Sequence, residues 1–269
     1  MNIFSFLRAA LPKPKIAAEK KARWKIAGCS LPGTAHLRRG RTCEDSVGWF
    51  ADDELLVIAV ADGAGSAALP ALGSALAVRT AINSFLAWQS DGAAFNSTNA
   101  TLILGRTCQC VLNTISERST ELGVEPRDLA STLILVVANR DFCAAAQIGD
   151  GAVVLKDESG NLVSLATPTN GEFANETVLL GCTPWIDVCI SSISEFPIKS
   201  IAVFTDGLQR LALRLPQGEP HAPFFMPLFD RLASLCEPEM EKVIRDFLDS
   251  PRVNARTDDD KSLVTAHFL

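Results

Sequence analysis

The sequence lacks any long uncharged apolar stretch. No segment of its 269 residues approaches the roughly 18 apolar residues that a membrane-spanning helix needs. The first residues hold only a short apolar run with no charged region before it, so we predict no secretory signal. An excess of positive charge is also missing, because the net charge at pH 7 is −6. These absences argue against partnership with nucleic acid or a membrane.

Cysteine is present but has no pattern that would hold a metal. The eight cysteines lie mostly in apolar stretches, and no Cys/His spacing typical of a zinc site occurs. Cys108 and Cys110 form the only close pair, in a predicted helix where their side chains would diverge. Ordinary reduced cysteines of a cytoplasmic protein explain this usage, so we predict a cytoplasmic location.

Composition is that of a globular protein with one large domain or two small ones. Hydrophobic residues make up 48% of the chain and charged residues 21%. Residues 1–22 are rich in basic and small residues toward their end and are predicted to be a leader, poorly ordered or helical. Residues 23–269 are predicted to form the main domain.

The predicted elements follow one another in blocks. Strands are expected at 24–30, 46–51 and 55–61, and helices at 67–88 and 96–122. Next come strands at 131–141 and 142–151, a hairpin at 153–166 with Gly160-Asn161 near its tip, and strands at 179–191 and 200–207. Helices near 223–235 and 238–250 and a strand at 262–269 complete the order. The polar segment 167–178 is expected to be a surface loop or flap. Such segregation favours an α+β fold with a sheet-on-sheet core and helices outside it over an alternating parallel fold.

Three apolar runs end in the dipeptide Asp-Gly, at Asp62, Asp150 and Asp206. A buried strand that stops on a carboxylate places that carboxylate at the rim of a sheet. Crowded carboxylates repel one another unless a cation neutralises them. The pattern therefore predicts a site for hard metal ions with oxygen ligands, and such sites often hydrolyse phosphates.

Asp-Gly is also a common turn dipeptide, so each pair alone is weak support. Asp91-Gly92 shows this, because it follows a predicted helix and is interpreted as a turn without function. The other three pairs differ in following apolar, strand-like runs. Glu44-Asp45 and Asp259-Asp260 add two further acidic pairs next to predicted strands.

Five short motifs, in order and at suitable distances, resemble those of the metal-dependent Ser/Thr protein phosphatases of type 2C, in particular their divergent bacterial branch. The motifs are Cys43–Ser46, Ala61–Gly65, Ile148–Gly151, Phe204–Leu208 and Asp259–Leu263. The resemblance extends from about Gly28 to the end of the chain, and segment 171–177 resembles the flap of the bacterial branch. Each motif is weak alone, but five in sequence, each beside a strand, are specific.

The resemblance implies a fold and a reaction. The fold would be a four-layer α/β/β/α sandwich, with a central antiparallel β-sandwich flanked by helices. The reaction would be hydrolysis of phosphoserine and phosphothreonine by a water that bridges two metal ions, without a phospho-enzyme. Phosphorylated proteins would be the substrates, and a Ser/Thr kinase would act in opposition.

The resemblance also implies metal ligands. Asp62 would bridge two Mn²⁺ or Mg²⁺ ions, and the carbonyl group of Gly63 would bind one of them. Asp206 and Asp259 would complete the first ion. Oxygen ligands select Mg²⁺ or Mn²⁺ over Zn²⁺.

The remaining acids have less defined implied roles. Asp45, with Glu44 beside it, would serve the second ion directly or through water. Asp150 is a candidate ligand for a third, weaker ion. Asp260 is expected to support the site or to lie at the surface rather than to bind metal.

The sequence departs from the family pattern where a phosphate-binding arginine is usual, because that position is Gly40. One of Arg38, Arg39 or Arg41 is expected to bind the phosphate instead, with Arg39 preferred among the three. The open alternative is that these arginines form only a solvated basic loop.

Two further positions differ from many family members. Ala64 replaces a histidine that follows the Asp-Gly pair in many eukaryotic members, and His36 or a metal-bound water is expected to protonate the leaving group instead. Arg210 stands where some members have another acid, which weakens the case for a third metal ion.

Two other enzyme classes share fragments of these motifs. Gly63-x-Gly65-x-x-Ala68 matches a dinucleotide-binding fingerprint, but Asp62 would crowd the pyrophosphate of an NAD-type cofactor with negative charge. Asp258-x-Asp260-x-Ser262 matches the nucleophile motif of haloacid-dehalogenase-like phosphatases. That motif should follow an early strand, whereas this one precedes the last predicted strand.

A catalytically inactive domain of the same fold, which binds or senses a phosphoprotein, is the alternative from another functional class. The altered arginine position favours it. Retention of Asp62, Asp206 and Asp259 argues against it.

Overall fold

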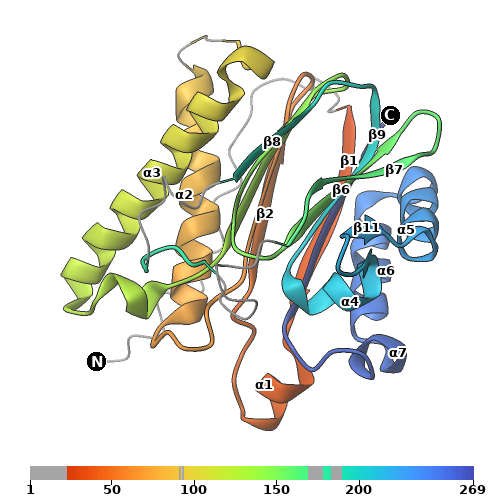
Figure 1. The fold of residues 1–269 in the computed structure, drawn as a ribbon. Helices are drawn as coiled ribbons and strands as arrows, with labels where there is room; N and C mark the ends of the chain where they lie inside the picture. Colours follow the sequence, from red (N-terminus) through yellow and green to blue (C-terminus); the bar gives the residue numbers. More distant parts are fainter. Residues whose placement is uncertain (1–22, 91, 93, 169–177, 183–189) are drawn as a thin grey trace.

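Two antiparallel five-stranded sheets pack face to face, and a pair of helices covers the outer face of each (Figure 1). This computed structural model describes residues 23–90, 92, 94–168, 178–182 and 190–269. The α+β prediction of a four-layer α/β/β/α sandwich is therefore confirmed. The predicted leader (1–22) and flap (171–177) lie outside the described residues.

The two sheets differ in which parts of the chain they use. The first has the order β1-β12-β9-β6-β7, with β1 (Trp24–Leu31), β12 (Lys261–Phe268), β9 (Ile198–Phe204), β6 (Ala152–Asp157) and β7 (Leu162–Ala166). The second has the order β2-β3-β4-β5-β8, with β2 (Ser46–Ala51), β3 (Leu56–Ala61), β4 (Leu133–Ala138), β5 (Cys143–Ile148) and β8 (Ile190–Ser194). A small hairpin pairs β10 (Leu213–Arg214) with β11 (Glu219–Pro220).

Long helices form the outer layers. α2 (Pro70–Ser90) and α3 (Ser97–Leu122) cover the second sheet, and α5 (Ala222–Ser234) and α6 (Glu237–Leu248) cover the first. Short helical segments complete the described chain: α1 (Thr34–Arg38), η2 (Pro126–Leu129), η4 (Asp206–Leu208), α4 (Gln209–Ala212) and α7 (Pro251–Asn254). Among the described residues, no helix is both long and apolar enough to cross a membrane.

The inner strands of each sheet are apolar on both faces because each sheet lies between two hydrophobic cores. In β3, Leu56, Ile58 and Val60 face the core between the sheets, and the alternate residues face the core beneath α2 and α3. A third core lies between the first sheet and helices α5 and α6. Burial on both faces explains why the strands appear in the sequence as continuous apolar runs rather than alternating ones.

The antiparallel pairing excludes the dinucleotide-binding alternative. β3 pairs antiparallel with both β2 and β4, whereas that class requires a parallel βαβ unit. The motif around Asp258 also precedes β12, the last strand, rather than following an early one. This position is the wrong one for a haloacid-dehalogenase-like nucleophile.

Element boundaries differ from the predictions in a few places. α2 begins at Pro70 rather than near residue 67. Proline favours the first turn of a helix because it has no backbone N–H to donate, and the N–H groups of that turn have no partner within the helix. α3 begins as predicted after Asn96, whose Oδ1 accepts hydrogen bonds from the N–H groups of Thr98 and Asn99. The predicted strand at 179–191 overlaps β8 only at its end, and 183–189 lie outside the described residues.

Candidate metal centre

Four aspartates approach one another at a single edge of the sandwich because of strand order and register. Ser46 at the start of β2 pairs with Ala61 at the end of β3, so Asp45 and Asp62 are neighbours on one sheet. On the other sheet β12 pairs antiparallel with β9, so Asp259 just before β12 lies beside Asp206 just after β9. We call Asp45, Asp62, Asp206 and Asp259 the acidic rim.

Hydrogen bonds connect the two sheets at this rim. The hydroxyl group of Thr205 donates to Asp45 Oδ2 at 2.8 Å, and the same hydroxyl oxygen accepts the N–H of Ser262 at 3.1 Å. The Thr132 hydroxyl oxygen accepts the N–H of Asp62 at 2.9 Å. Sequence reasoning assigned no role to these hydroxyl groups, although Thr205 directly precedes an Asp-Gly pair.

Close backbone packing explains why glycine follows Asp62 and Asp206. A Cβ on Gly63 would lie 2.7 Å from the Pro70 carbonyl oxygen and 2.8 Å from that of Glu44. A Cβ on Gly207 would collide with the carbonyl oxygen of Asp260. Any side chain at either position would push the neighbouring backbone and its acids apart.

Burial and mutual repulsion raise the pKa values of three rim acids. Burial raises the pKa of Asp45 to about 6, although hydrogen bonds from its neighbours partly oppose the shift. Burial, then the charges of Asp150, Asp259 and Asp45, raise the pKa of Asp206 to about 7. The pKa of Asp62 is raised well above its ordinary value by burial and by the charges of Asp45 and Asp206.

The rim has the features of a cation site rather than of an ordinary buried cluster. Asp45 and Asp62 are neighbours across the β2–β3 pair, and the charge of Asp45 helps to raise the pKa of Asp62. Asp45 Oδ1 and Glu44 Oε2 are buried and accept no hydrogen bond within the described part of the chain. Among these residues no three His, Cys, Asp or Glu side chains are already arranged around one point. A cation at the rim would neutralise this repulsion, and the oxygen donors suit Mg²⁺ or Mn²⁺.

Asp260 is buried and positions the segment that carries Glu44. Its side chain is 2% exposed. Oδ1 accepts hydrogen bonds from the N–H of Gly33 at 2.6 Å and from Nδ1 of His36 at 2.8 Å, and Oδ2 accepts the N–H of Glu44 at 2.6 Å. Asp260 therefore holds the loop that leads into β2, and it does not lie at the surface.

Glu44 and His36 lie beside the acidic rim. Glu44 Oε1 is 2.5 Å from the guanidinium group of Arg41, and Glu44 Oε2 is 3.8 Å from His36 Nε2. The Glu44 side chain is buried, and that of His36 is 13% exposed. Glu44, Arg41 and His36 therefore form a small polar group beside the acidic rim.

The three candidate phosphate-binding arginines differ in their partners. Arg38 pairs with Asp258 at 3.3 Å on the surface, and Arg41 pairs with Glu44. Arg39 is exposed at the end of α1 and forms no ion pair with any described residue. Gly40 has a φ of 67° and reverses the chain after α1. That left-handed conformation explains why an arginine is disfavoured at position 40.

The remaining predicted site residues lie close to the rim. Asp150 is partly exposed, and its charge is the largest contribution from a neighbour to the raised pKa of Asp206. Its carbonyl oxygen accepts a hydrogen bond from Gln209 at 2.6 Å. Gly63 forms an isolated bridge with Ser131, which keeps its backbone next to Asp62.

Comparison with known proteins supports the same interpretation. The family model "Protein phosphatase 2C" matches residues 32–249. The chain is 34% identical over 253 residues to Serine/threonine-protein phosphatase 3 of Escherichia coli (strain K12), covering 90% of this chain and 98% of that protein.

Solved structures share the fold at lower identity. The catalytic domain of the serine threonine protein phosphatase PstP, solved with 2 manganese ions, matches with a TM-score of 0.59 and 16% identity, covering 91% of this chain and 97% of that one. PppA, described as a regulatory component of the T6SS in Pseudomonas aeruginosa, matches with a TM-score of 0.61 and 17% identity, covering 92% and 99%. RsbX in complex with magnesium matches with a TM-score of 0.56 and 18% identity, covering 93% and 98%.

Proposed function

The chain belongs to the protein phosphatase 2C family, a family of protein Ser/Thr phosphatases, and on that premise we propose that its acidic rim binds two Mn²⁺ or Mg²⁺ ions. One observation carries the proposal. Asp45 is buried and Asp62 and Asp206 are partly buried at the same sheet edge, and burial and mutual repulsion raise the pKa values of all three. Such a cluster is unfavourable with all its charges unless cations neutralise them.

In the proposed site Asp62 would serve both ions, as the family resemblance implies, and its pKa shows that it lies near the charges of Asp45, Asp206 and Asp259. Asp206 and Asp259 would hold one ion together with the Gly63 carbonyl group. Asp45 would hold the other.

Glu44 and Asp150 flank this pair of ions in the proposal. Glu44 has one buried carboxylate oxygen without a hydrogen-bond donor among the described residues, so it can bind the second ion directly or through water. Asp150 is a weaker ligand for a third ion. Arg210 does not supply the acid that would strengthen such a third site.

The bound ions would neutralise the phosphate dianion and lower the pKa of the attacking water. The side chains of the chain itself orient the substrate. Arg39 has its guanidinium group available to bind two phosphate oxygens, whereas Arg41 is held by Glu44 and supports the loop. Fixing the phosphate with its leaving oxygen away from the acidic rim favours in-line displacement.

His36 is the proposed proton donor to the leaving serine or threonine oxygen. Its Nδ1 is fixed by Asp260 at 2.8 Å, which orients the ring, and its Nε2 lies 3.8 Å from Glu44 Oε2 beside the acidic rim.

We place this activity in the cytoplasm, where a Ser/Thr kinase would supply the phosphorylated proteins. No disulfide joins any of the seven cysteines within the described residues, which suits a reducing compartment.

Hydrolysis of a phosphothreonine peptide, measured with Mn²⁺, with Mg²⁺ and with EDTA, tests the proposal. We expect turnover that needs a divalent ion and is lost in Asp62→Asn, with the circular dichroism spectrum unchanged. Asp246→Asn, on the exposed face of α6, is the matched control and should retain full activity. Absence of turnover with every divalent ion, despite measurable Mn²⁺ binding, would instead favour the phosphoprotein-binding alternative.

A further inference from the structure

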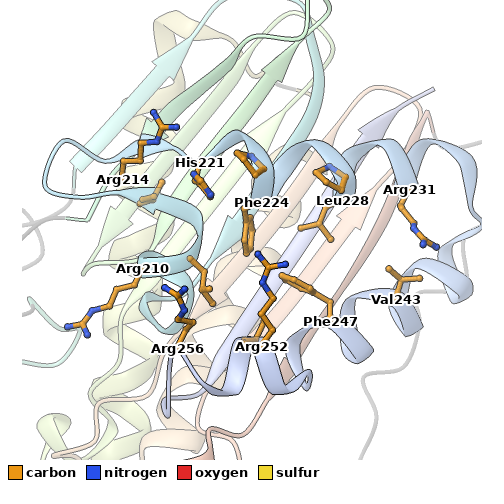
Figure 2. A pocket seen from close by; sticks show the side chains of 15 residues that line it. Arg210, Arg214, His221, Phe224, Leu228, Arg231, Val243, Phe247, Arg252 and Arg256 are labelled. Atoms are coloured by element: carbon orange, nitrogen blue, oxygen red, sulfur yellow. The ribbon is translucent and has the colours of Figure 1, made fainter.

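A second site lies on the helical side of the first sheet, between α4, α5, α6 and α7. It is a pocket of about 600 Å³, within the usual range for ligand pockets. Its floor is apolar and includes Phe224, Leu228 and Phe247, with the Phe224 and Phe247 rings 5.5 Å apart. Figure 2 shows these side chains between α5 and α6. The proposed reaction uses none of them.

Five arginines and one histidine surround this apolar floor, and none of the described residues that line it is acidic. The basic residues are Arg210, Arg214, His221, Arg231, Arg252 and Arg256. All five arginines are exposed, and within the described chain none of them forms an ion pair. In a chain of net charge −6, this is a local concentration of uncompensated positive charge.

The spacing of the arginines indicates a ligand with several negative groups. Arg231 lies near the far end of α5, about 10 Å along the helix from Phe224 at its start. Arg210 and Arg256 lie at the opposite end of the pocket (Figure 2). A single phosphate cannot contact guanidinium groups at both ends. An acidic peptide with a bulky apolar side chain matches both the distributed charge and the apolar floor.

The pocket begins next to the acidic rim. Arg210 follows Asp206 by four residues, and Arg256 precedes Asp259 by three, which limits their Cα separations to roughly 14 Å and 11 Å. A peptide bound in the pocket therefore lies within reach of a phosphorylated residue at the rim. Arg210, which replaces an acid found in some relatives, contributes to this pocket.

We propose that this arginine pocket binds an acidic segment of the phosphoprotein substrate that carries a bulky apolar side chain and flanks the phosphorylated residue. This inference rests on the proposed function, because it takes the occupant to be part of the substrate. The pocket would raise the local concentration of the phosphorylated residue at the rim, and so would choose among phosphoproteins that the rim alone cannot distinguish.

Direct binding tests the pocket without using catalysis. The probe is a fluorescein-labelled, unphosphorylated peptide, Asp-Glu-Glu-Phe-Leu-Glu-Glu-Asp, measured by fluorescence anisotropy. The double variant Arg231→Glu/Arg252→Glu should bind about tenfold more weakly than the wild type, because two attractions become repulsions. Replacing Phe and Leu of the probe by Ala should weaken binding to the wild type as well.

The control is Arg79→Glu/Arg106→Glu, which changes the charge equally on the exposed faces of α2 and α3, in the opposite layer. This variant should bind the probe like the wild type. Equal weakening by both double variants would overturn the inference, because it would show attraction to net charge alone. Binding of phosphatidylglycerol vesicles through these arginines, without binding of the peptide, would overturn it in favour of a lipid surface.

Kinetics separate this inference from the proposed function. A phosphothreonine peptide extended by the acidic probe sequence should have a higher kcat/KM than one extended by an uncharged sequence. The Arg231→Glu/Arg252→Glu variant should lose that preference and hydrolyse p-nitrophenyl phosphate normally. Equal hydrolysis of both peptides by the wild type would overturn the inference and leave the phosphatase proposal intact. Arginine-dependent peptide binding without any turnover would support the pocket and contradict the phosphatase proposal.

Discussion

The acidic rim and the arginine pocket are neighbours in the chain but are built in opposite ways. The rim acids follow or precede strands, so sheet register fixes their backbones, and three of them have raised pKa values because they are buried together. The arginines lie on helices and short connecting segments, are exposed, and keep their charges solvated.

The comparison shows what each kind of charge requires. Carboxylates held close together at low exposure destabilise the ionised rim unless a cation neutralises them. The function of the rim should therefore depend on a bound cation and be sensitive to substitution of its acids. Exposed arginines cost little when unliganded, so the pocket can select among ligands without endangering the fold. Substitutions at the rim should therefore have large effects, and those at exposed arginines small ones.

The largest expected effect is the loss of catalysis in Asp206→Asn. Removing one anionic rim ligand should lower kcat for a phosphothreonine peptide by about 10³-fold, equivalent to about 4 kcal/mol of barrier. The metal-free protein should be no less stable, since a repelled buried charge has been removed. Steady-state kinetics with Mn²⁺ and thermal melts without it measure both effects. Activity within threefold of the wild type would contradict the role of Asp206 as a metal ligand.

Asp260→Asn should chiefly affect stability. The carboxylate accepts three hydrogen bonds from Gly33, His36 and Glu44, and an amide NH₂ group would face one of these donors. We expect a loss of about 2 kcal/mol in the free energy of unfolding, measured by urea denaturation. Asp258→Asn is the control, because its side chain is exposed and its one ion pair among the described residues is with Arg38 on the surface. Equal stability of the two variants would contradict the positioning role of Asp260.

The metal-free protein should lose stability as the pH rises from about 4 to about 7. The folded-state pKa values of Asp45 and Asp206 are raised to about 6 and about 7, above their ordinary value of 3.8. The folded state therefore binds more protons than the unfolded state in this window. Their stabilising contribution is complete below the ordinary pKa and is lost as the pH rises through the folded pKa.

Thermal melts of the wild type and Asp206→Asn across this window isolate the effect from other titrating groups. His267 acts in the opposite direction, because burial and nearby lysines lower its pKa to about 4. The variant should gain in Tm relative to the wild type as the pH rises, and saturating Mn²⁺ should remove the decline in the wild type. A Tm difference that does not change with pH would contradict the proposed repulsion at the rim.

The smallest expected effect is at the phosphate-binding arginine. Arg39→Ala should raise KM for p-nitrophenyl phosphate about tenfold, which corresponds to about 1.4 kcal/mol of binding. Arg38→Ala, which removes only a surface ion pair, should change KM little. A larger increase in KM for Arg38→Ala than for Arg39→Ala would instead identify Arg38 as the phosphate-binding residue.

The sequence predicts the acidic rim well because its residues are tied to regular structure. Each Asp-Gly pair ends an apolar run, and a strand that stops on Asp62 or Asp206 must place it at a sheet edge. The sequence also predicts the four layers, because the apolar strands and the long helices occur in separate blocks along the chain.

Other features depend on contacts between distant segments and have no local pattern. The three hydrogen bonds of Asp260 join residues more than 200 positions away, and α1 is too short to show helical periodicity. The arginine pocket gathers residues from 210 to 256 across several short elements, without a shared motif. Only the fold brings them around one apolar floor.

Mn²⁺ binding to the wild type and to Asp62→Asn, measured by electron paramagnetic resonance together with equilibrium dialysis, tests the central claim most directly. The acidic rim should bind two Mn²⁺ ions per wild-type chain, and Asp62→Asn should lose at least one of them while remaining folded. A wild-type protein that binds no Mn²⁺, or a variant that binds as many ions with the same affinity, would contradict the assignment of the rim as the metal centre.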